Sequence, residues 1–307
     1  LLLGSCQSEI TESDSDIPPF WESEEEKNAF LQKACIYEVN IRQYSPEGNF
    51  RGFMKHLPRL QEMGVDILWL MPIHKIGMKN RKGTLGSYYS VKDYCSVNTN
   101  FGSEEDFRAL VEEAHKLGMA VILDWVANHT AWDHHWVESN PEFFTKDSLG
   151  QMMPPVADWT DVVDLDFENK DLRDSMVKSM QYWIREFNID GFRCDVAGEV
   201  PTDFWISARD SLNKMRPVFM LAEAEKNELH PKAFEMGYAW HLHHLMNEVA
   251  KGNEDASVIN EYYAKLEFPE GSYKMNFTSN HDENTWNKNA IERMGDNYTN
   301  MIVFSFT

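Results

Sequence analysis

The chain has 307 residues, of which 42% are hydrophobic, so it can bury the core of one large domain or of two small ones. Its net charge of −21 argues against partners that need a basic face, namely nucleic acid and anionic lipid, and leaves a neutral polymer as an acceptable ligand. The four cysteines have neither metal-type spacing nor the density of a disulfide framework. No run of about 18 apolar residues is present, so no membrane-spanning helix is predicted.

The first residues have a composition of their own. Residues 1–6, LLLGSC, resemble the end of a signal peptide followed by a bacterial lipobox, in which the cysteine is lipidated. The polar and acidic stretch at residues 7–20 is predicted to be a disordered tether. We therefore expect a lipid anchor on Cys6 and a location at the bacterial cell envelope, on the outer membrane or on its periplasmic or extracellular face.

From residue 21 onward, apolar runs alternate with helical patterns, which is typical of βα units and a parallel sheet. Strands are expected at residues 34–39, 65–71, 119–126, 189–196, 218–223 and 273–279. Helices are expected at residues 53–63, 104–117, 172–187, 204–215, 256–266 and 297–306, with a weaker strand and helix within 234–250. The alternation is interrupted at about 128–169, a long irregular segment of the kind that is usually functional.

Both a doubly wound sheet and a (β/α)8 barrel fit this alternation. No phosphate-binding glycine fingerprint follows the first strand, and ionisable side chains instead recur at the carboxyl ends of four strands. These strand ends are residues 124–129 (DWVANH), 191–195 (GFRCD), 221–223 (LAE) and 277–282 (FTSNHD). Because barrel active sites are built at this edge of the sheet, the pattern favours the barrel.

The four segments resemble, in order, the four signature regions of the α-amylase family of retaining glycoside hydrolases. The resemblance runs from about Tyr37 to the end of the chain. It implies an α/β fold of the (β/α)8 TIM-barrel type, with an irregular domain B inserted after the third strand at about 128–169. The fourth region would then lie on the seventh strand, so we expect residues 21–307 to form a barrel that is truncated before its eighth strand.

The resemblance also implies the reacting groups. Arg193 and Asp195 are two residues apart and face the same way in a strand, and a guanidinium beside a carboxylate keeps the carboxylate ionised, as a nucleophile must be. The family's nucleophile falls on Asp195 and its general acid on Glu223, although the family usually has Gly where Ala222 stands. Glu225 is a rival for the acid, because it would share the face of a continuing strand.

Further side chains receive roles by the same resemblance. Asp282 matches the third catalytic carboxylate, which grips sugar hydroxyls. Asp124 and Asn128 are expected to give structural support. The side chains expected to bind substrate are Tyr89, His129, Arg193 and His281, with Tyr88 as the alternative to Tyr89.

No cofactor is expected to be required. Asn128 matches a calcium ligand of many family members, and the aspartates at 158, 161 and 164 could supply oxygen atoms. However, Glu199 replaces a histidine that commonly follows the nucleophile, and no Asp- or Asn-rich loop follows the first strand. We therefore predict no metal site, and interpret the aspartates as a solvated surface.

The favoured function is hydrolysis of α-1,4-glucosidic bonds in starch-like glucans or malto-oligosaccharides by double displacement. A transglycosylase or sugar isomerase of the same family would use the same residues, because it shares the covalent intermediate. A non-catalytic sugar-binding or scaffold member is disfavoured, because such relatives typically lose a carboxylate that this chain retains. The predicted partner is the α-glucan substrate.

Overall fold

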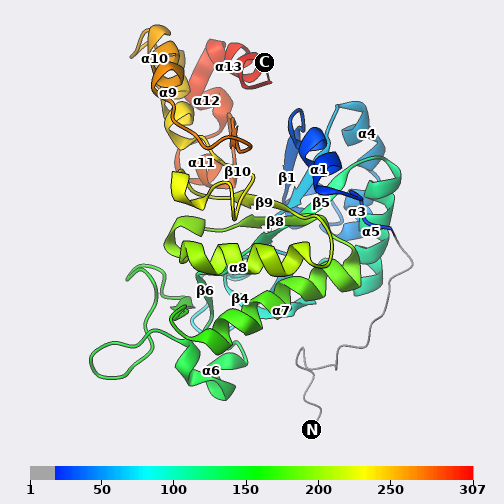
Figure 1. The fold of residues 1–307 in the computed structure, drawn as a ribbon, viewed down its shortest axis with the longest axis vertical. Helices are drawn as coiled ribbons and strands as arrows, with labels where there is room; N and C mark the ends of the chain where they lie inside the picture. Colours follow the sequence, from blue (N-terminus) through cyan, green and yellow to red (C-terminus); the bar gives the residue numbers. More distant parts are fainter. Residues whose placement is uncertain (1–17, 307) are drawn as a thin grey trace. The chain divides into compact units, whose positions relative to one another are not determined.

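The computed structural model describes residues 18–306, which form two compact units, the first ending at Met220 and the second beginning at Leu221 (Figure 1). Seven parallel strands alternate with helices along these residues. The strand β9 (Phe219–Ala222) spans the boundary between the two units. Each unit is described in turn.

The first unit is built on four parallel strands in chain order. They are β1 (Ile36–Val39), β2 (Ile67–Leu70), β5 (Ala120–Trp125) and β8 (Gly191–Cys194). Every residue of β2, β5 and β8 is buried, and burial on both faces explains why these strands are apolar apart from Asp124 in β5 and Arg193 in β8. The register places Asp124 of β5 opposite Arg193 of β8, so two of the predicted site residues are neighbours across the sheet.

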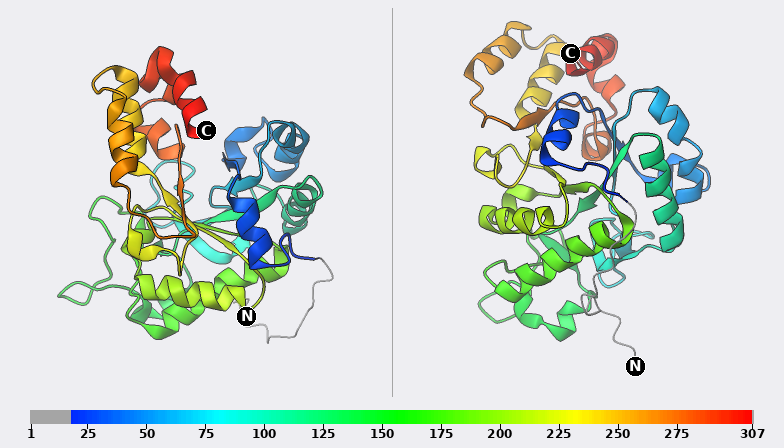
Figure 2. Two further views of the ribbon diagram at one scale, coloured as in Figure 1. Left: turned by 45° about the horizontal axis from the view of Figure 1, so that its top comes forward. Right: turned by 45° about the vertical axis from the view of Figure 1, so that its right-hand side comes forward.

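Helices follow these strands close to where the sequence predicts them. Their bounds are α5 (Glu104–Lys116), α7 (Lys170–Phe187) and α8 (Thr202–Asn213). A capping box between Ser103 and Asp106 begins α5, and Gly118, in a left-handed conformation (φ +77°), follows its end. The helices α7 and α8 pack side by side, as Figures 1 and 2 both show.

The helix predicted at residues 53–63 is divided in two. The structure has α3 (Phe50–Met54) and α4 (Leu57–Glu62), with Pro58 in the first turn of α4. Proline lacks an N–H group and its ring clashes with the preceding turn of a continuous helix, but it is tolerated where a new helix begins. The break therefore follows from the position of this proline.

Several elements of the first unit were not predicted from the sequence. An antiparallel hairpin joins β3 (His74–Ile76) to β4 (Val91–Val97), and the short α2 (Ile41–Tyr44) follows β1. The helix α1 (Glu24–Leu31) precedes the sheet, and Ser23 caps its first turn. Phe20, at the end of the stretch predicted as a tether, contacts the rings of Trp21, Phe30 and His115.

The irregular segment at 128–169 has little regular structure, as expected. It contains a small antiparallel pair, β6 (His129–Ala131) with β7 (Val162–Asp164), the single turn α6 (Trp136–Ser139) and a 3-10 turn, η1 (Pro141–Phe143). The pairing of β6 with β7 joins the beginning of the segment to its end. The segment therefore begins and ends at the carboxyl edge of β5.

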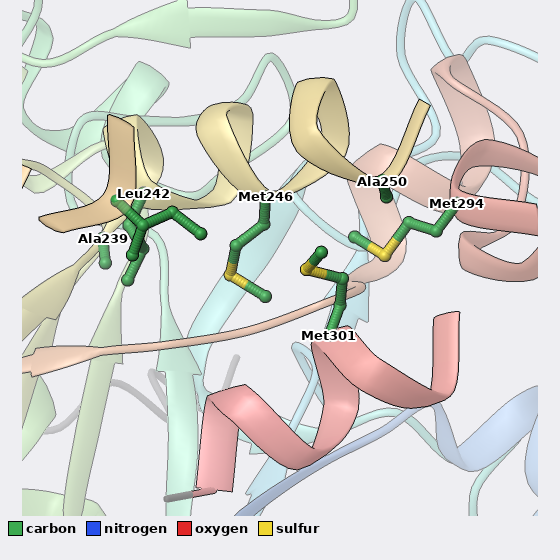
Figure 3. Close-up of a cluster of buried hydrophobic side chains, with 7 residues drawn as sticks. Ala239, Leu242, Met246, Ala250, Met294 and Met301 are labelled. Atoms are coloured by element: carbon green, nitrogen blue, oxygen red, sulfur yellow. The ribbon is translucent and has the colours of Figure 1, made fainter. Parts of the chain in front are cut away.

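The second unit begins with the last two residues of β9, which pair in parallel with β10 (Met236–Tyr238), and β10 pairs in parallel with β11 (Tyr273–Met275). Its helices are α9 (Trp240–Lys251), α10 (Ser257–Lys265), α11 (His281–Trp286), α12 (Ala290–Met294) and α13 (Tyr298–Phe306). A buried apolar cluster joins α9 to α12 and α13 through Met246, Met294 and Met301 (Figure 3). Within residues 18–306, no helix is long and apolar enough to cross a membrane.

Candidate functional site

An arginine near the carboxyl end of β8 is hydrogen-bonded to two carboxylates. Nη1 of Arg193 lies 2.7 Å from Oδ1 of Asp124 and 3.0 Å from Oδ1 of Asp195. Arg193 and Asp124 are fully buried, and Asp195 is only 8% exposed. Because a buried charge is costly unless it is paired, the guanidinium favours the ionised form of both carboxylates. Asp195 is thereby held as a carboxylate at the rim of the sheet.

Two further donors engage the second oxygen of Asp124. The indole Nε1–H of Trp69 lies 3.2 Å from Oδ2 of Asp124, and the hydroxyl of Tyr89 lies 3.1 Å from the same atom. Burial, and next the charge of Asp124, raise the pKa of Tyr89 well above its usual value, so the phenol stays protonated and donates. Four strand or loop segments thus contribute to one buried polar cluster around Arg193.

The two tyrosines considered for substrate binding, Tyr89 and its alternative Tyr88, have different contacts. The hydroxyl of Tyr88 donates to Oδ1 of Asn40 at 3.1 Å, and the guanidinium of Arg42 lies over the Tyr88 ring at 4.5 Å. Tyr88 is therefore engaged with the residues that follow β1. Tyr89 is the tyrosine that reaches the cluster of Asp124 and Arg193.

The backbone turns sharply directly after Asp195. Val196 has φ +38° and ψ +44°, a left-handed conformation that is rare for a β-branched residue, and it precedes the 3-10 turn η2 (Ala197–Glu199). Such strain is retained at functional sites, where the surrounding structure enforces it. Here it ends β8 within one residue of the predicted nucleophile.

His129 lies at the start of the irregular segment and is almost completely buried. Its Nδ1 is 3.2 Å from Nδ2 of Asn128, and its ring contacts the edge of Trp159. Burial lowers the pKa of His129 to about 4, so the imidazole is neutral near pH 7. A neutral imidazole suits hydrogen bonding to an uncharged hydroxyl, and the role of His129 in substrate binding stays a prediction.

The four buried residues of β9 lead directly to Glu223, which lies in the second unit and is partly exposed. Glu225, its rival, has two charge-compatible partners: Nζ of Lys274 lies 2.9 Å from its Oε1, and the backbone N–H of His241 donates to its Oε2 at 2.8 Å. These contacts hold the Glu225 side chain against β11 and the start of α9. The assignment of Glu223 as the general acid, with Glu225 as its rival, stays a prediction.

The fourth predicted region folds differently from the expectation. The strand expected at 273–279 ends at Met275, and His281 and Asp282 lie in the first turn of α11, which Asn280 caps. Nε2 of His281 is 3.5 Å from Oδ1 of Asp282, whose side chain is 45% exposed. Asp282 is thus presented at a helix N-terminus, which favours a negative charge, rather than directly by a strand.

A cavity of about 530 Å³ opens beside Glu225 in the second unit. The rings of His241 and Tyr262 stack at one wall with their centroids 5.5 Å apart. The charged groups at the cavity are mostly paired with each other, since Lys265 lies 3.3 Å from Glu261 and Lys274 pairs with Glu225.

The aspartates considered for calcium do not converge on one point. Asp161 pairs with Lys82 at 3.5 Å, and Asp164 lies in β7, where burial raises the pKa of its carboxyl group. Among residues 18–306, no group of three or more His, Cys, Asp or Glu side chains is arranged to hold a metal ion. The independence from cofactors remains a prediction.

Sequence reasoning missed Trp69. It interrupts an aliphatic strand, Ile67–Leu70, and contacts both Asp124 and Arg193. The signal was a tryptophan one strand away from a predicted buried carboxylate, because a buried indole N–H usually finds an acceptor. No local sequence pattern encodes the strand register that brings the two together.

Comparison with known proteins identifies relatives along most of the chain. The sequence model described as "Alpha amylase, catalytic domain" matches residues 12–151 and 156–300. The crystal structure of an α-amylase from Lactobacillus plantarum superposes with a TM-score of 0.83 at 37% identity, covering 90% of this chain and 69% of that one. This likeness confirms the predicted α/β barrel class.

Two curated relatives differ in the activity that their names state. An α-amylase, MalA, of Haloarcula japonica is 26% identical over 83% of this chain and 40% of its own length. An α-1,4-glucan:maltose-1-phosphate maltosyltransferase of Picrophilus torridus is 31% identical over 75% of this chain and 38% of its own length. The chain therefore spans about two fifths of the length of these relatives.

Proposed function

Because the chain belongs to the α-amylase family, through that family's catalytic domain, we propose that it hydrolyses α-1,4-glucosidic bonds in starch-like glucans or malto-oligosaccharides with retention of configuration. The single observation that supports the proposal most strongly is the position of Asp195. A buried arginine holds it ionised at a strand end, one residue before a strained turn. An ionised, positioned carboxylate is what attack at an anomeric carbon requires.

The proposed reaction has two displacements. A carboxylate oxygen of Asp195 forms a bond to the anomeric carbon while the glycosidic C–O bond breaks, and the leaving oxygen takes the proton of Glu223. In the second step Glu223, now a carboxylate, takes a proton from water, and the water oxygen replaces Asp195 at the anomeric carbon. Glu223 ends protonated again, and two inversions leave the α configuration. Asp282, His281, His129 and Tyr89 are proposed to bind the sugar.

The carboxylates can be tested separately. Asp195→Asn and Glu223→Gln should each reduce kcat on a glucan by about 10⁴-fold or more, whereas Glu225→Gln should retain most of the activity. An α-glucosyl fluoride should partly rescue Glu223→Gln, because fluoride leaves without a proton. An inactive Glu225→Gln together with an active Glu223→Gln would reverse the assignment of the acid.

Transfer to a second sugar is the alternative outcome of the same intermediate. The similarity to a maltosyltransferase supports this alternative reaction. The two reactions differ in whether water or a sugar hydroxyl attacks the glycosyl-enzyme. Incubation with maltotriose distinguishes them, because hydrolysis gives only shorter products and transfer also gives longer ones.

We also propose that Cys6 anchors the protein to the cell envelope through lipid. Cys6 lies outside the described residues 18–306, and the proposal is supported by the lipobox-like residues 1–6 and the acidic stretch after them. Several acyl chains on one residue hold a protein firmly at a membrane, whereas one chain holds it weakly. Cys6→Ser should release the protein into the soluble fraction of a bacterial host. A wild-type protein that is already soluble and unlipidated there would contradict the proposal.

A further inference from the structure

The structure points to Trp69 as a positioning residue for Asp195, acting through Asp124 and Arg193. We propose that its indole N–H and its ring face together fix the guanidinium that holds Asp195 in place. This inference rests on the proposed function, because it presumes that Asp195 is the nucleophile.

Trp69 contacts the two residues that control Asp195. It is 2% exposed and lies on β2, the strand next to β5. Its Nε1–H donates to Oδ2 of Asp124 at 3.2 Å, and the guanidinium carbon of Arg193 lies 4.9 Å from the centre of its ring. One side chain thus provides a hydrogen bond to the carboxylate and a cation–π contact to the arginine.

The arrangement matters because Asp124 and Asp195 use the same nitrogen of Arg193. Both carboxylates are hydrogen-bonded to Nη1, which has two hydrogens to donate. The Trp69 N–H and the Tyr89 hydroxyl both donate to the other oxygen of Asp124, and together they fix the rotation of that carboxylate. The ring of Trp69 fixes the plane of the guanidinium. With both fixed, the second N–H of Nη1 is directed at Asp195.

The competing explanation is that Trp69 only packs the core, and Trp125 provides a matched control. Trp125 lies on the neighbouring strand β5 and is also fully buried, but its Nε1 has no hydrogen-bond partner. Its ring contacts are with His74, Tyr94 and Phe192. A Trp→Phe change therefore removes the same atoms at both positions, and only at Trp69 does it remove a hydrogen bond to Asp124.

The experiment compares Trp69→Phe with Trp125→Phe in the full-length protein, measuring kcat, KM and the pH dependence of kcat/KM on maltotriose. Trp69→Phe should lower kcat by about 10- to 100-fold with KM nearly unchanged, because a hydrogen bond to a charged group is lost and Asp195 acts in the chemical step. The acidic limb of the pH profile of kcat/KM should move to higher pH in Trp69→Phe, since Asp195 becomes easier to protonate. Trp125→Phe should change neither kcat nor the pH dependence of kcat/KM, even where both variants lose thermal stability.

Equal kinetics for the two variants would overturn the inference and show that Trp69 only fills the core. If Trp69→Phe melts below the assay temperature, Trp69→Tyr, which also lacks the indole N–H, is judged by the same criteria. Asp195→Asn measured in parallel separates the two proposals. An active Asp195→Asn would refute the proposed function itself, whereas an inactive Asp195→Asn beside a fully active Trp69→Phe would refute only the role of Trp69.

Discussion

His74 is a buried histidine whose surroundings make it sensitive to acid. It packs against the rings of Tyr94, Trp125 and Trp183, and neither of its ring nitrogens has a hydrogen-bond partner. Burial lowers its pKa from 6.5 to about 4, and the charge of Asp93 opposes this only in part. The folded protein therefore keeps this imidazole neutral over a range of pH in which the unfolded chain would protonate it.

This difference predicts how stability depends on pH. Between pH 6.5 and about 4 the unfolded chain binds a proton at His74 that the folded protein does not, so stability is fully present above pH 6.5 and falls as the pH decreases. The loss attributable to His74 is on the order of 3 kcal/mol at the acidic end. Urea unfolding at several pH values should show a shallower dependence for His74→Phe than for the wild type. An unchanged slope would mean that His74 is protonated in the folded state.

Single residues of the site differ in how far the sequence could predict them. The spacing of Arg193 and Asp195 within one strand was enough to predict that they pair, and the structure brings them within 3.0 Å. The contact between Trp69 and Asp124 depends on the alignment of two strands, which no local pattern encodes. The ion pair between Glu225 and Lys274 likewise joins two residues that are far apart in the sequence.

At the scale of elements, the strands that are buried on both faces were predictable, because burial leaves continuous apolar runs. The helix α1 was not, because its apolar pattern is weak: its buried residues are Leu31 and a lysine, Lys27. The ammonium of Lys27 is fully buried and donates to the carbonyl of Val218 at 3.0 Å and to Glu24 at 2.8 Å. Because a charged side chain occupies an inward-facing position, the apolar periodicity that would predict this helix is missing.

The attachment of α1 can be tested at this lysine. Lys27→Met should lower the free energy of unfolding by about 1–3 kcal/mol, because it leaves the Val218 carbonyl without this donor in the interior. Glu24→Gln should cost less than about 1 kcal/mol, since Glu24 is half exposed and water can replace its partner. Denaturant unfolding of both variants gives the comparison. A Lys27→Met variant as stable as the wild type would show that α1 contributes no net stability through this contact.

The methionine cluster holds the helices of the second unit together. Met246 is fully buried on α9 and packs in one cluster with Met294 and Met301 (Figure 3). Met246→Ala should therefore destabilise the protein by about 2–5 kcal/mol through lost contacts and the cavity left behind. The exposed Met215 gives a control, for which the same substitution should cost less than about 0.5 kcal/mol. Similar losses at both positions would contradict the packing described here.

For the whole molecule, the order of the seven parallel strands was predictable, because strand–helix alternation and right-handed crossovers leave few topologies. The fold of the irregular segment at 128–169 was not, since its short elements, β6 and β7, are defined by pairing with each other. The family could be identified from four short segments, because each combines ionisable side chains in a pattern and order that the family shares. Substrate preference depends on loop shape, for which the sequence has no comparable pattern.

We propose that this domain cleaves α-glucosidic bonds through a covalent intermediate on Asp195. The most direct test follows the products of malto-oligosaccharide hydrolysis by proton NMR during the first minutes of reaction, before mutarotation equilibrates the anomers. The new reducing ends should appear first as the α anomer, and Asp195→Asn should produce neither anomer. The initial appearance of the β anomer, or undiminished product from Asp195→Asn, would contradict it.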